Sequence, residues 1–257
     1  MIGIIGGSGL DQLAALSVVR EHRVRTAWGT PSAPLLEGLL QGTPVVFLPR
    51  HGAGHHLPPH RINYRANIAA LRDFGVREVL GVAAVGGIGA DCGPGAIVVP
   101  DQLIDYTWGR EHTFHDGQDS GVAHAEFEHP YDDALRRCLL DAGHALGVPV
   151  VAGGCYGATQ GPRLETAAEI ARMARDGCTL VGMTGMPEAA LAREAGLAYA
   201  TCALSVNWAA GLSAAPITMD EIMRELAEGM GTIVRLLAHA VALRAAVAAP
   251  AQAGNRA

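Results

Sequence analysis

The chain contains no lysine, because all 19 of its basic side chains are arginine. This absence excludes mechanisms that need a lysine amine, such as a Schiff base on lysine or the phosphate-binding lysine of P-loop enzymes. Acidic side chains outnumber basic ones, and the formal net charge is -6. Such a balance offers no electrostatic footprint for a nucleic-acid backbone, so we expect small molecules rather than nucleic acid as partners.

Cysteine is scarce as well. The five cysteines are scattered, odd in number and without a C-x-x-C pair, which is typical neither of a disulfide framework nor of a zinc site. The first ten residues lack the basic segment of a signal peptide, and the uncharged stretch 195–219 is interrupted by polar residues, glycine and proline. We therefore expect a cytoplasmic protein with no metal and no membrane span.

Apolar side chains are abundant: 49% of the 257 residues are hydrophobic and only 17% are charged, which is enough for a full core. Short apolar runs predict strands at residues 1–5, 45–48, 78–85, 96–99, 148–153, 180–183 and 197–205. Helical spacing predicts helices at residues 61–74, 131–146, 165–176, 186–195 and 219–247. The alternation predicts a single α/β domain over residues 1–247, with a mixed central β-sheet flanked by helices and a flexible tail at 248–257.

Glycine-rich segments follow three of the predicted strands. The first surrounds Ser8, the second begins with Arg50 and His51, and the third follows Ala84. Glycines let backbone N–H groups approach an anion, and arginine suits a bidentate contact with phosphate. The first segment lacks the third glycine of a dinucleotide fingerprint. The pattern therefore favours an anion site, although each loop taken alone also fits a plain turn.

Some of these residues have an alternative interpretation. The histidines of the second loop also suggest a metal-dependent hydrolase, but no carboxylate or thiolate lies at supporting spacing. Glu165 stands at a predicted helix start, where a glutamate often acts only as a capping or dipole partner. Asn207 follows a predicted strand, where an amide either forms a turn or contacts a ligand.

In order and spacing, the segments 5–10, 50–52, 161–163 and 182–188 resemble the trimeric purine nucleoside phosphorylase and methylthioadenosine phosphorylase family, over residues 1 to about 243. The resemblance implies a homotrimer that uses inorganic phosphate to cleave a nucleoside, without metal or organic cofactor. It also implies a set of phosphate-binding residues: Ser8, Arg50, His51, Ala84 and Thr184. Ala83 departs from the family, since relatives often carry Asn or Thr there.

The same resemblance assigns the purine to Glu165 and Asn207. A 6-oxopurine offers N1–H as a donor and O6 as an acceptor, which suits a carboxylate and an amide N–H, whereas a 6-aminopurine reverses the pattern. Methylthioadenosine phosphorylases carry serine and aspartate at these two positions and a second aspartate where this chain has Ala209. Glu165 and Asn207 together therefore predict a 6-oxopurine nucleoside as the substrate.

The sugar end differs from that of inosine-type enzymes, which carry a histidine for the 5'-hydroxyl where this chain has Met219. An apolar wall of Met219 and Ile222 would pack well against a thiomethyl group, although Met219 alone also fits a core position. The resemblance adds Met183 and Leu164 as substrate contacts and implies that His124 reaches the neighbouring subunit's site.

Together these residues predict phosphorolysis of S-methyl-5'-thioinosine. Four alternatives stay open: methylthioadenosine phosphorylase, inosine/guanosine phosphorylase, a nucleoside-binding protein without catalysis, and the metal-dependent hydrolase that the loop histidines suggest.

Overall fold

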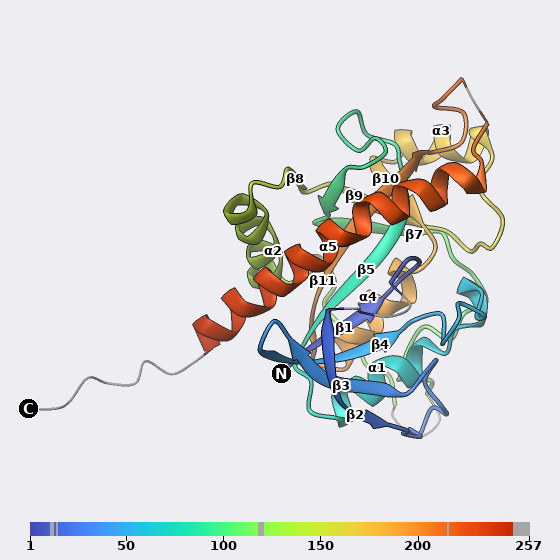
Figure 1. Cartoon of the computed structure of the whole chain (residues 1–257). Coiled ribbons are helices and arrows are strands. Elements are labelled where there is room, and N and C mark those ends of the chain that lie inside the picture. Colours follow the sequence, from blue (N-terminus) through green and yellow to red (C-terminus); the bar gives the residue numbers. More distant parts are fainter. Residues whose placement is uncertain (11–12, 14, 118–120, 215, 249–257) are drawn as a thin grey trace, which may run out of the picture.

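The computed structural model describes residues 1–10, 13, 15–117, 121–214 and 216–248. These residues form one mixed sheet of eleven strands with helices on both faces (Figure 1). The predicted fold class, an α/β domain with a mixed central sheet flanked by helices, is therefore confirmed. The predicted tail at 248–257 lies outside the described residues, apart from Ala248, which ends the last helix.

Four parallel strands run through the centre of the sheet: β4 (Thr43–Pro49), β1 (Ile2–Gly6), β5 (Glu78–Gly87) and β11 (Ala198–Trp208). β1 pairs with β4 on one side and β5 on the other, and β5 pairs with β11. Their side chains are buried almost throughout, as expected for strands covered on both faces. Because the strands are parallel, their carboxyl ends meet at one edge of the sheet, where ligands of α/β proteins bind.

The other strands extend this centre in three directions. Beyond β4, the sheet continues antiparallel into β3 (Leu35–Leu40) and β2 (Leu16–His22). At the carboxyl end of β5, β10 (Cys178–Gly182) pairs antiparallel with Gly86 and Gly87 and is followed by β9 (Cys155–Ala158) and β7 (Gln102–Asp105). β6 (Ile97–Val99) pairs with β11 and with β8 (Val150–Ala152).

All seven predicted strands are present, but the sequence does not predict β2, β3, β7 or β9. Most side chains of β2 are exposed, so it has no buried alternation to detect. β7 and β9 have four residues each, too few for a clear period. These strands are specified by pairing with neighbours rather than by their own pattern.

The helices cover both faces of the sheet. α2 (Asp133–Leu146) and α5 (Met219–Ala248) pack together against β11 in one apolar cluster, while α1 (Tyr64–Asp73) and α4 (Gly185–Glu194) pack in another. α3 (Ala167–Arg175) packs beside β10. A short 3₁₀ helix (Pro59–Arg61) precedes α1. The five predicted helices are all present, with ends within three residues of the prediction.

α5 is long and apolar enough to cross a membrane by length and composition alone. One face of the helix, however, is fully buried against the sheet and α2 through Ile233, Leu236, Leu237 and Val241. Packing of this face into the core accounts for its apolar composition.

Gly182, the last residue of β10, tests how tightly the sheet is packed at the edge where the parallel strands end. An added Cβ would overlap the buried Tyr156 phenol and come within 3.0 Å of Val85. We expect Gly182→Ala to lower the free energy of unfolding by about 2 kcal/mol through overpacking, measured by urea denaturation.

Gly231, in the exposed middle of α5, provides the matched control, because its Cβ would meet nothing within 4 Å. Gly231→Ala should raise stability by up to about 1 kcal/mol, since alanine favours the helix. If both substitutions changed the free energy of unfolding equally, the Tyr156 side chain would be able to move aside from the added Cβ at little cost.

Candidate functional site

A cavity of about 440 Å³ lies where the parallel strands end, a size suited to a small molecule. Its lining comes from the loops after β1 and β4, from β5 and β11, from the segment after β10, from the segment before α3 and from the start of α5. All but one of the predicted site residues line it: Ser8, Arg50, His51, Ala84, Leu164, Glu165, Met183, Thr184, Asn207, Met219 and Ile222.

His124 is the exception. Within the described ranges, the residues that line the cavity do not include it, and its side chain is exposed in the segment 121–127. The cavity of a single chain is therefore built without His124.

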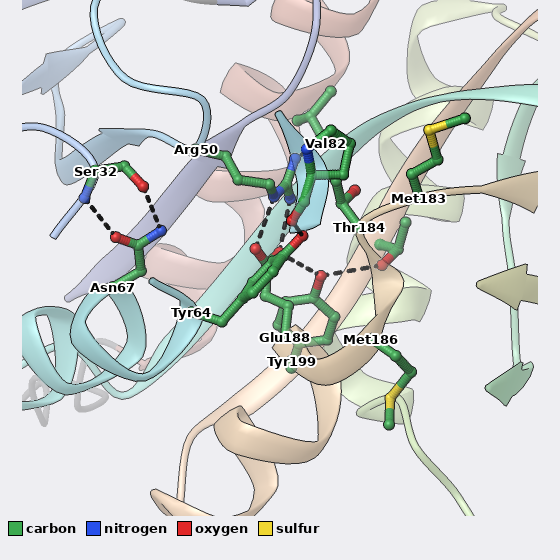
Figure 2. A network of polar contacts seen from close by, with 12 residues as sticks. Ser32, Arg50, Tyr64, Asn67, Val82, Met183, Thr184, Met186, Glu188 and Tyr199 are labelled. Atoms are coloured by element: carbon green, nitrogen blue, oxygen red, sulfur yellow. Dashed lines mark hydrogen bonds and ion pairs between the residues drawn. The ribbon is translucent and has the colours of Figure 1, made fainter. Parts of the chain in front are cut away.

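One wall of the cavity includes Arg50, which forms a buried ion pair with Glu188 (Figure 2). Arg50 donates from Nε and Nη2 to the two carboxylate oxygens, each at 2.7 Å. It also donates from Nη1 to the Val82 carbonyl at 2.7 Å, while the Tyr199 hydroxyl donates to Glu188 at 2.8 Å. Three of the five guanidinium N–H groups are thus bound within the protein, and Nη1 and Nη2 each keep one for a ligand.

The charge of Arg50 is secure despite its burial. The side chain is 1% exposed, and burial alone would lower its pKa, but the Glu188 carboxylate outweighs this and holds the pKa above its usual value. Glu188 is completely buried in the first turn of α4, where the partial positive charge of the helix N-terminus favours a carboxylate. The pair therefore places a fixed cation in the cavity wall.

His51, next to Arg50, is a neutral imidazole at pH 7. Burial, and then the charge of Arg50, lower its pKa to about 4. Its Nδ1 lies 2.8 Å from the Leu57 carbonyl, so Nδ1 carries the proton and Nε2 is left as an acceptor. The ring stacks on His55, whose Nε2 lies 3.5 Å from Ser8 Oγ.

Glu165 lies just before α3, not in its first turn. The sequence predicts that this helix begins at residue 165, but Thr166 is its N-cap and the helix begins at Ala167. The capping box is made by Thr166 and Glu169, so the capping partner is Glu169 and not Glu165. Glu165 is part of the cavity lining, and its carboxylate accepts a 2.6 Å hydrogen bond from the Thr159 hydroxyl.

Asn207 belongs to β11, which continues three residues beyond the predicted end at 205. The pairing register with β5 shifts between Ser205 and Asn207, and such a bulge redirects the side chain that follows it. Asn207 Nδ2 donates to the Trp208 carbonyl at 2.7 Å, which orients the amide. One N–H and the Oδ1 oxygen are left for a ligand.

The part of the cavity lining that comes from the start of α5 is apolar. Met219, Ile222 and Leu226 of α5 form it together with Ile217. Leu226 is buried, whereas Met219 is 64% exposed at the first position of the helix. In the single chain, Met219 therefore lies at the rim of the cavity and Leu226 lies deeper.

Two of the loop histidines, His51 and His55, stack with ring centroids 4.2 Å apart. Among the residues that the structure describes, no group of three or more His, Cys, Asp or Glu side chains is placed to hold a metal ion.

Three buried polar residues of the site are not predicted from the sequence: Glu188, Thr159 and Arg110. Glu188 resembles an ordinary charge in the first turn of a helix, and Arg110 lies in an irregular loop. The partners of Glu188 and Arg110 are remote in sequence: Glu188 lies 138 positions after Arg50, and Arg110 bonds the Thr159 carbonyl 49 positions later. Thr159 bonds Glu165 only six positions later, but its burial depends on the fold, so local spacing contains no signal for any of the three.

Residues 1–242 match a protein-family model described as the Phosphorylase superfamily. A relative from Xanthomonas campestris, named probable S-methyl-5'-thioinosine phosphorylase, is 57% identical over 223 residues, 86% of this chain and 89% of the relative. A probable 6-oxopurine nucleoside phosphorylase from Thermococcus kodakarensis is 44% identical, covering 93% of this chain and 91% of the relative. Methylthioadenosine phosphorylase from Schistosoma mansoni, solved with adenine, has a TM-score of 0.91 at 34% identity, covering 95% of this chain and 92% of that chain.

The Arg50–Glu188 pair generates a prediction about stability. Glu188→Gln leaves the buried cation without a counter-charge, so we expect the free energy of unfolding to fall by about 3–5 kcal/mol. Asp73→Asn, which breaks an exposed pair with Arg72, should cost less than about 1 kcal/mol. Urea denaturation at one pH measures both, and equal small losses would mean that Glu188 does not balance the charge of Arg50.

Proposed function

The chain belongs to the phosphorylase superfamily, and we propose that it converts S-methyl-5'-thioinosine and inorganic phosphate into hypoxanthine and 5-methylthioribose 1-phosphate. One observation carries this choice of substrate: a single cavity has a carboxylate and an amide, Glu165 and Asn207, in its lining together with an apolar wall that includes Met219 and Ile222. The Xanthomonas campestris relative, which has this activity in its name, supports the proposal.

Phosphate would bind beside Arg50, within reach of Ser8, His51, Thr184 and the backbone at Ala84. The two free N–H groups of Arg50 and the hydroxyls of Ser8 and Thr184 donate to phosphate oxygens. Neutral His51, with Nε2 as an acceptor, suits the protonated oxygen of a phosphate anion. Arg50 needs no rearrangement to act, because Glu188 already fixes its position.

In the reaction, a phosphate oxygen forms a bond to the anomeric carbon as the bond from that carbon to the purine nitrogen breaks. The electron pair of the broken bond leaves with the purine, which becomes neutral hypoxanthine by taking up the proton that the phosphate gives up. Donors such as the Asn207 amide stabilise the negative charge that develops on the base, and they contribute most when they are already oriented. Phosphate is a co-substrate, and the proposal requires no metal and no organic cofactor.

The purine would be recognised by Glu165 and Asn207. The carboxylate accepts from N1–H of a 6-oxopurine, and the remaining amide N–H of Asn207 donates to O6. Met183 and Leu164, which also line the cavity, would contact the nucleoside. A 6-aminopurine would face two mismatched groups, each costing about 1–3 kcal/mol.

The 5'-methylthio group would pack against Met219 and Ile222, because an apolar wall leaves a 5'-hydroxyl without a partner. In the proposed homotrimer, His124 of each chain would approach a neighbouring cavity, which accords with its exposure in the single chain. The five cysteines are free thiols, which supports a cytoplasmic setting.

Methylthioadenosine is the second candidate substrate, favoured by the likeness to the Schistosoma mansoni structure and by the apolar 5' end. Glu165 and Asn207 oppose it, since both match a 6-oxopurine. A non-catalytic nucleoside-binding protein would bind the substrate without consuming phosphate.

Purified protein should release free base from methylthioinosine faster than from methylthioadenosine or inosine, and only with phosphate present. We expect the kcat/KM for methylthioinosine to exceed that for methylthioadenosine by at least roughly 5- to 150-fold, which is the effect of one of the two mismatched groups. Chromatography of the released base measures all three reactions, and a chelator should leave the rates unchanged.

Asn207→Asp provides the matched variant, because its oxygens only accept hydrogen bonds. It should lower the rate with methylthioinosine more than the rate with methylthioadenosine. Preferred adenine release by the unaltered protein would overturn the proposed base preference, and no turnover of any nucleoside would favour the binding protein.

A further inference from the structure

Thr159, directly after β9, forms a short hydrogen bond to Glu165 that the sequence motifs do not indicate. Its hydroxyl donates to Glu165 Oε1 at 2.6 Å, and the residue is 8% exposed. The Gly182 carbonyl lies 3.3 Å from the same hydroxyl, but it already accepts the Thr159 backbone N–H at 2.8 Å. Because the carboxylate is both nearer and charged, it is the stronger acceptor for the single hydroxyl proton.

This bond restricts the side chain of Glu165. The terminal torsion of a glutamate is broad, so a free carboxylate turns easily among orientations. With Oε1 held by Thr159, rotation of the carboxylate breaks a hydrogen bond to a charged group, which is among the stronger kinds in proteins. Oε2 is left as the oxygen that can accept from a ligand.

The backbone on both sides of this bond is fixed as well. Arg110, a buried cation, donates from Nη2 to the carbonyls of Thr159 at 3.1 Å and Gln160 at 2.8 Å. On the other side, the capping box of α3 begins at Thr166, the residue after Glu165. Both ends of the hydrogen bond therefore sit on anchored backbone.

Arg110 also links this segment to residues 183–186, of which Met183 and Thr184 line the cavity. Its Nη1 donates to the carbonyl of Met183 at 2.9 Å and to that of Met186. The segment 183–186 includes Thr184 and leads into α4. Arg110 thus holds the segment that contains Thr159 against the segment that contains Thr184.

We propose that Thr159 is a positioning residue that holds Glu165 as a fixed hydrogen-bond acceptor, and so sharpens the preference for 6-oxopurines over 6-aminopurines. The inference rests on the proposed function, in which Glu165 faces N1 of the base. A 6-aminopurine has an acceptor at N1, which would meet the fixed acceptor Oε2. A carboxylate free to turn away would tolerate this mismatch, and the Thr159 bond prevents that movement.

The test compares Thr159→Val, which keeps the shape of the side chain but removes its donor, with Thr159→Ser, which keeps the donor. Binding of hypoxanthine and adenine is measured by calorimetry, and kinetics with methylthioinosine and methylthioadenosine are measured in parallel. Thr159→Val should weaken hypoxanthine binding about tenfold, because the Glu165 carboxylate is then no longer held in place and its hydrogen bond to the base is weakened. It should leave adenine binding unchanged or tighter, and Thr159→Ser should restore the original ratio.

Kinetics separate positioning from a general structural role. For methylthioinosine, Thr159→Val should raise KM more than it lowers kcat, and it should add nothing in a Glu165→Ala background, because the group that it positions is already absent. The inference is overturned by an unchanged ratio of hypoxanthine to adenine binding, by equal losses for both bases, or by failure of Thr159→Ser to restore the ratio. Hypoxanthine binding without phosphate-dependent turnover would instead contradict the proposed function alone.

Discussion

The buried ion pair between Arg50 and Glu188 is the interaction on which the rest of the site depends. Burial of two charges is costly, and it is compensated here by two 2.7 Å hydrogen bonds and by further bonds to Val82 and Tyr199. These residues follow β4, begin α4 and lie in β5 and β11. The pair therefore links β5 and β11 to the loop after β4 and to the start of α4, and its geometry is set before any ligand arrives.

The lining of the cavity differs in chemistry from one part to another. The part beside Arg50 has a fixed cation and a neutral imidazole, which suits an anion. Glu165 and Asn207 are each oriented by a hydrogen bond to the protein, so the polar groups that we assign to the purine are also held in place. The α5 wall is apolar. Preorganisation of polar groups around a bond that is to be broken is a main source of catalytic rate.

Local sequence patterns predict much of this architecture. The fold class, the five helices and the seven predicted strands are confirmed, and the family that the motifs resemble is confirmed by the match over residues 1–242. Short or exposed strands such as β2 and β9 are missed, because pairing with neighbours specifies them. Glu188, Thr159 and Arg110 are missed for a related reason: burial of a polar side chain depends on contacts made by chain folding, which periodicity does not encode. The roles of Glu165 and Asn207 come from family resemblance and not from spacing.

In the reaction that we propose, phosphate bound beside Arg50, and not water, attacks the sugar. The decisive experiment lets methylthioinosine react with oxygen-18-labelled phosphate in unlabelled water and analyses the sugar product by mass spectrometry. We expect a methylthioribose phosphate that keeps every labelled oxygen, because the new bond to the anomeric carbon uses a phosphate oxygen. An unphosphorylated sugar that carries oxygen from water would contradict it.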